Sequence, residues 1–101
     1  MQHKRMRTVT LKNALTGYAG NAFASSGRDV EASIQPMSGD AAAKIYGLTP
    51  SEMRLMLANP GMGIVRGMGV CVDVAADAEP DYRVVYAADW SRHTVVHLRF
   101  I

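Results

Sequence analysis

The chain has 101 residues, of which 49% are hydrophobic and 20% are charged, with a net charge of +2 at pH 7. This length accommodates one domain with one core, and no apolar stretch approaches the ~20 residues that a membrane-spanning helix needs. Because Cys71 is the single cysteine, an internal disulfide and a two-cysteine metal site are both excluded.

The charges are distributed unevenly along the chain. Residues 1–28 contain five basic and no acidic side chains, and the rest contain six basic and nine acidic ones, which gives +5 and −3. No apolar segment follows the basic residues 1–7, so no secretory signal is predicted. A basic and flexible arm at 1–7 indicates either an acidic surface or nucleic acid nearby, or a solvated chain end.

The first part of the chain predicts two strands. Thr8 to Leu11 alternates polar and apolar residues, as a half-buried strand does. Residues 15–27 are rich in glycine, serine and asparagine and predict a loop. Residues 30–35 alternate again and predict a second strand, which Pro36 ends.

Residues 38–63 predict a helical insertion between the second and third strands. A short helix is expected over Ala41–Tyr46, with a capping segment before it. A second helix is expected to begin at Thr49. It would place Met53, Met56 and Leu57 on one face at helical spacing.

The β pattern returns at Gly67. One face of the next strand is expected to carry the side chains of Met68, Val70, Val72 and Val74. Cys71 and Asp73 fall on the other face, and residues 75–81 predict a turn.

The end of the chain predicts an antiparallel hairpin. In its first strand Tyr82, Val84 and Tyr86 are expected to share one face, and residues 93–101 form the second strand. With five or six strands in total, the fold class is mainly β. We expect a single domain over residues 1–101, a small closed or nearly closed antiparallel barrel that leaves few strand edges exposed.

Two patterns resemble binding sites without matching them. The glycine-rich run 61–69 lacks the Gly-Lys-Ser/Thr ending of a phosphate-binding loop and precedes a strand. His93 and His97 have the spacing of zinc ligands on a helix, but on a strand they lie ~13 Å apart. No cofactor and no metal site are therefore predicted.

No catalytic residue is predicted either. Asp89, Ser91 and His93 cluster in the sequence without the strained turn of a nucleophile elbow. Cys71 has no basic cluster beside it to activate the thiol, so it is interpreted as a small packing residue. The chain is not expected to be an enzyme.

The middle of the chain is rich in methionine. Met53, Met56, Met62 and Met68 surround the insertion. They fit the core face of a helix, or an adaptable surface for contacts with other proteins, because a thioether repacks against varied shapes.

Several segments together resemble the head-closure (stopper) proteins of tailed bacteriophages, which are small β-barrels between head and tail. The resemblance rests on the order and length of five segments, which are residues 30–36, 39–47, 67–70, 80–86 and 90–96. They span most of the chain after residue 29, and none is a catalytic signature.

The resemblance implies a structural subunit of the virion neck, assembled in the host bacterial cytoplasm, that helps to retain DNA and to attach the tail. Its partners would be copies of itself in a ring of six or twelve, the portal or its adaptor, and a tail terminator or tail-tube protein. The isolated protein would be a monomer, and no membrane is involved. The insertion would reach neighbouring proteins or narrow the channel. The implied partner-binding residues are Lys4, Arg5, Arg7, Met53, Met56 and Met62.

Because such a ring surrounds the DNA path, Lys4, Arg5 and Arg7 would also face the channel and contact phosphate without sequence preference. The alternative function is a small nucleic-acid-binding barrel of the OB type. The basic arm favours it, whereas the placement of Tyr82 and Tyr86 beside Val84 is more typical of a core than of a base-stacking surface.

Overall fold

The computed structural model describes residues 6–15, 23–37, 44, 47 and 52–101. Among these residues no helix has the length and apolar character needed to cross a membrane. The strands are β1 (Arg7–Lys12), β2 (Arg28–Pro36), β3 (Met53–Ala58), β4 (Gly69–Cys71), β5 (Tyr82–Asp89) and β6 (Thr94–Phe100).

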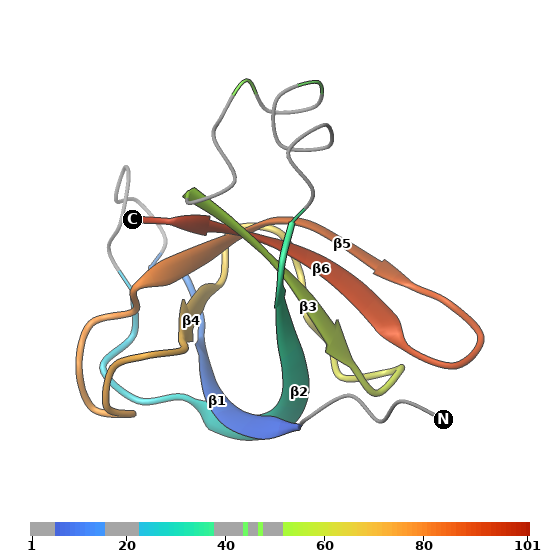
Figure 1. Cartoon of the computed structure of the whole chain (residues 1–101). Coiled ribbons are helices and arrows are strands. Elements are labelled where there is room, and N and C mark those ends of the chain that lie inside the picture. The colour runs from blue at the N-terminus through green and yellow to red at the C-terminus, as the bar shows by residue number, and fades with distance from the viewer. Residues whose placement is uncertain (1–5, 16–22, 38–43, 45–46, 48–51) are drawn as a thin grey trace.

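The strands form a closed barrel in the order β1-β2-β3-β6-β5-β4 (Figure 1). Every neighbouring pair is antiparallel, including β1 with β4, which closes the barrel. The predicted mainly β fold, the antiparallel barrel and the final hairpin of β5 and β6 are confirmed. Closure gives most of the main chain a hydrogen-bonding neighbour on both sides.

Alternation of side chains explains the core. Residues two apart on a strand point to the same face, and in each strand one such set fills the barrel. The core comprises Val9, Leu11, Val30, Ala32, Met56, Ala58, Ile64, Met68, Val70, Val72, Tyr82, Val84, Val96 and Leu98.

The predicted helix beginning at Thr49 is wrong from Met53 onward, because Met53–Ala58 is strand β3. This strand pairs with β2 on one side and with β6 on the other. Its apolar residues fit both helical and strand spacing, so the local pattern does not distinguish a helix from a strand. Pairing with two neighbouring strands makes this segment a strand.

The helix expected over 41–46 lies outside the described residues except for Lys44. The helical insertion is therefore not confirmed, and the segment between β2 and β3 is residues 37–52.

A bulge in β5 corrects the expected placement of its tyrosines. The register between β5 and β6 shifts between Val84 and Tyr86, and an extra residue on one strand turns the following side chains to the other face. Tyr82 is consequently buried, with 3% of its surface exposed, whereas Tyr86 is 42% exposed.

Strand β4 is shorter than the sequence suggests. The carboxylate of Asp81 accepts hydrogen bonds from the main-chain N–H groups of Val72 (2.8 Å) and Asp73 (3.0 Å). These groups are therefore engaged by a side chain instead of a strand. Val74, expected on the same face as Val70 and Val72, is 40% exposed, whereas those two residues are buried.

Candidate functional site

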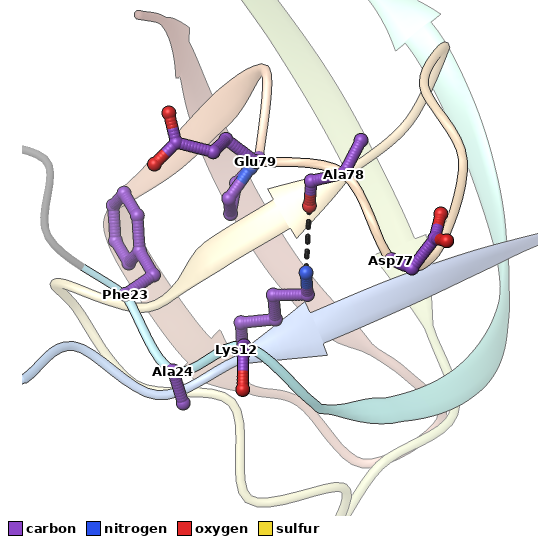
Figure 2. Close-up of a pocket in the computed structure, with 8 residues that line it drawn as sticks. Lys12, Phe23, Ala24, Asp77, Ala78 and Glu79 are labelled. Atoms are coloured by element: carbon purple, nitrogen blue, oxygen red, sulfur yellow. Dashed lines mark hydrogen bonds between the residues drawn. The ribbon is translucent and has the colours of Figure 1, made fainter.

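A pocket of about 170 Å³ lies beside the end of β1, under the loop that precedes β5 (Figure 2). Lys12 is one of the residues that line it and is 2% exposed. Its Nζ donates a hydrogen bond of 2.6 Å to the main-chain oxygen of Ala78. The other lining residues are Phe23, Ala24, Ser25, Asp77, Ala78, Glu79 and Pro80.

The groups around this pocket fit a structural role. Cys71 lies near Lys12, and its thiol donates to the same Ala78 oxygen at 3.6 Å. Burial raises the pKa of the Cys71 thiol, and the charge of Lys12 offsets part of the rise. A thiol with a raised pKa stays protonated at neutral pH and is a poor nucleophile. Lys12 therefore ties β1 to the loop, and the pocket gains no reactive group from Cys71.

A second pocket, of about 240 Å³, opens beside β2 and β3. It is lined by Met6, Ser33, Leu57, Ala58, Asn59 and His93. Ser33 is buried, and Gln35 Nε2 donates a hydrogen bond of 3.2 Å to its hydroxyl. The walls are mainly apolar, which suits contact with another apolar surface better than chemistry.

This second pocket continues into an apolar surface on the outside of the barrel. The register places Leu55 opposite His97 and Leu57 opposite Val95 between β3 and β6. Between β6 and β5 it places Val95 opposite Ala88 and His97 opposite Tyr86. The outer apolar face is therefore formed by Leu55, Leu57, Tyr86, Ala88, Val95 and His97, which are exposed or half-buried.

Two rings on this face contact each other. The rings of Tyr86 and His97 have centroids 4.7 Å apart and are tilted by 36°, within the range of favourable ring contacts. Burial lowers the pKa of His97. The imidazole is therefore mostly neutral at pH 7, so the outer apolar face carries little charge at this position.

Four of the six residues that the sequence grouped as partner-binding, Arg7, Met53, Met56 and Met62, are described by the structure. Lys4 and Arg5 lie outside the described residues. Arg7 begins β1, and its guanidinium donates to the oxygen of Val72 (2.7 Å) and to Asp73 (3.1 Å).

The three methionines of this group differ in solvent exposure. Met53 and Met56 are fully buried at 0% exposure, and Met62 is half-buried against the core. Of the two interpretations of these residues, core packing holds for Met56, although on a strand instead of a helix. Neither Met53 nor Met56 presents a surface in this barrel.

Asp89, Ser91 and His93, which cluster in the sequence, lie at the tip of the final hairpin, and all three are exposed. His93 is exposed and lies outside β6, while the Asp89 carboxylate accepts a hydrogen bond of 2.6 Å from Thr94 Oγ1. Within the described ranges, no group of three or more histidine, cysteine, aspartate or glutamate side chains could hold a metal ion.

Comparison of the chain with protein-family models, with curated proteins and with solved structures finds no match. A function for this barrel therefore has to be inferred from the surface of the residues that the structure describes.

Proposed function

We propose that the chain is a head-closure or connector subunit of a tailed bacteriophage. It forms a ring between the portal or its adaptor and the tail, helps to retain DNA and attaches the tail. It works through contacts with other proteins and performs no reaction. Its place is the neck of the virion, after assembly in the host bacterial cytoplasm.

The observation that carries this proposal is the outer apolar face on a closed barrel. Small apolar and aromatic side chains from three adjacent strands form one surface, and interface centres are depleted of charge in the same way. The resemblance of segments 30–36, 67–70 and 80–86 to stopper proteins supports the same role. The basic residues Lys4 and Arg5 then lie near the DNA path, where they contact phosphate.

Rescue of particle assembly tests the proposal. Purified protein is added to DNA-filled heads that lack it, together with purified tails, and joined particles are counted by electron microscopy. Wild-type protein should join them. Leu57→Lys, which places a charge on the outer apolar face, should reduce joining at least ~10-fold, a loss of about 1.4 kcal/mol of contact energy.

Val74→Lys is the matched control, because Val74 is exposed in the loop after β4 and away from that face. It should join particles as well as the wild type does. Heads that a control extract rescues but the purified protein does not would contradict the connector role.

A second candidate, the nucleic-acid-binding barrel, is favoured by one observation. Tyr86 and Trp90 are 42% and 60% exposed, and exposed aromatic rings can stack on bases. Binding of labelled single-stranded DNA that weakens steeply with added salt would support this role. Absence of binding at low salt would contradict the nucleic-acid-binding role.

A further inference from the structure

Strand β5 is paired differently along its two edges. Towards β6 it is paired from Tyr82 to Asp89, except at the bulged Val85. Towards β4 it is paired only at Tyr82 and Arg83. Val84 N–H then donates to the oxygen of Met68, and Gly67 N–H donates to the oxygen of Val84, both at 2.8 Å.

The chain leaves this edge at Gly67, whose φ is +98°, a conformation that glycine adopts readily. Among the described residues nothing takes its place beside Val85–Asp89. On the other side of the hairpin, β6 stays paired with β3 as far as Thr94, and the tip of the hairpin projects beyond β3 in Figure 1. The segment Val85–Asp89 is called the open edge below.

The hydrogen bonds of the hairpin show which main-chain groups face outward. Trp90 N–H donates to the oxygen of His93 at 2.7 Å. Bonding towards one neighbour alternates along an antiparallel strand, so Ala88 and Tyr86 direct their main-chain groups towards β6. Ala87 and Asp89 therefore direct their N–H and C=O groups towards the open edge.

The side chains along the open edge do not protect it. Natural proteins block such edges with lysine, proline, a bulge or a covering segment. Here the bulge lies at the start, between Val84 and Tyr86, and Val85–Ala88 contains no charge and no proline. The carboxylate of Asp89 is held by Thr94, and Trp90 is 60% exposed beside the edge.

From these observations we infer that the open edge pairs with the open edge of a second copy of this chain. The two strands run antiparallel about a twofold axis through Ala87, so that Ala87 pairs with Ala87 of the partner copy. In this register Tyr86 of one copy lies beside Ala88 of the other, a large side chain next to a small one. The edge is self-complementary because each copy offers the same alternating donors and acceptors.

This contact is independent of the proposed function. A twofold contact uses the same surface on both copies, whereas neighbours in a ring of six contact each other through different surfaces. The pair is therefore a form of the free protein, in place of the monomer that the resemblance implies. It would have to separate if the ring needs the same edge.

Sedimentation velocity tests the inference on the purified full-length chain. From micromolar to millimolar concentration, the wild type should shift from the monomer of 10.9 kDa to a species of twice that mass. Ala87→Pro removes an N–H that faces the open edge and leaves the bonds to β6 intact, a substitution that edge strands tolerate. It should weaken the dimer at least ~10-fold.

Ala76→Pro, in the exposed loop before β5, is the matched control and should dimerise like the wild type. A wild type that stays monomeric throughout, or an Ala87→Pro variant that dimerises with unchanged affinity, would overturn the inference. If Ala87→Pro does not fold, hydrogen exchange of the backbone amides in the wild type tests the pairing instead. Protection of the Ala87 and Asp89 amides should rise with protein concentration, and protection that stays constant rejects the pairing.

Discussion

Lys12 is the residue whose position is least expected from its chemistry. Lysine is almost never fully buried without a partner, yet Lys12 is 2% exposed. Its stem packs inside the molecule, while the ammonium reaches the Ala78 oxygen (Figure 2). A charged donor makes a stronger hydrogen bond than a neutral one, and this bond joins residues 66 positions apart in the chain.

Replacing Lys12 by methionine should therefore destabilise the fold. Lys12→Met keeps the apolar stem and removes the charged donor, at an expected cost of about 1–3 kcal/mol in the free energy of unfolding. Urea denaturation followed by circular dichroism measures the difference. Lys44→Met, at an exposed position, should leave stability within ~0.5 kcal/mol of the wild type. Equal stability of both variants would mean that the Lys12 bond contributes nothing.

His97 should make stability depend on pH. Burial lowers its pKa below the ordinary value of 6.5, so the unfolded chain takes up a proton more readily than the folded one. The contribution of neutral His97 to the free energy of unfolding is fully present above pH 6.5. It is lost as the pH falls through the lower pKa of His97 in the folded state. Urea unfolding between pH 8 and pH 5, with His97→Gln for comparison, measures it. The variant should lack this part of the pH dependence, and an identical profile would contradict the assignment.

At the scale of elements, the approach of β1 to β2 depends on a residue with no side chain. A Cβ at Gly27 would lie 2.0 Å from the main-chain oxygen of Leu11 and 2.9 Å from Lys12 Cγ. Because the nearest atom belongs to the backbone of β1, a rotamer change cannot relieve the clash.

Gly27→Ala should accordingly cost about 1–3 kcal/mol, as overpacking does when the backbone has to shift. Thermal unfolding should show a clearly lower midpoint, whereas Ser26→Ala, at the neighbouring exposed position, should melt like the wild type. A Gly27→Ala protein of unchanged stability would show that the connection before β2 adjusts freely.

The sequence predicts strands well where polar and apolar residues alternate, and poorly where both faces are apolar. Alternation located β1 and β2 correctly. In β3 both faces are apolar because Met56 faces the core and Leu55 faces the outer apolar face. That pattern is also compatible with a helix, and only pairing with neighbouring strands distinguishes the two. The β5 bulge, which turns Tyr86 outward, has no signal in the local pattern either.

The surface sites were less predictable, because they depend on which strands become neighbours. The outer apolar face combines residues of β3, β5 and β6 that lie up to 42 positions apart between Leu55 and His97. Nothing near Lys12 in the sequence indicates its burial. Strand spacing argued against zinc binding by His93 and His97, but β6 begins at Thr94, so only His97 lies on a strand.

For the whole molecule, closure of the barrel should make unfolding cooperative. The closing pair joins β1 to β4, and the core takes side chains from every strand, so no strand has a core of its own. We expect one transition by near- and far-ultraviolet circular dichroism. Refolding should take milliseconds to seconds, since most pairing is between distant segments. Two separated transitions would contradict this expectation.

The short strand β4 also determines how the barrel responds to tension. Force applied to the two chain ends enters at β1 and β6, which are not neighbours. One route between them crosses β4, held by three residue pairs to β1 and two to β5. The other crosses β2 and β3 through longer ladders of five pairs each. The barrel should therefore tear at β4 first and open into a curved sheet that still holds its remaining strands together.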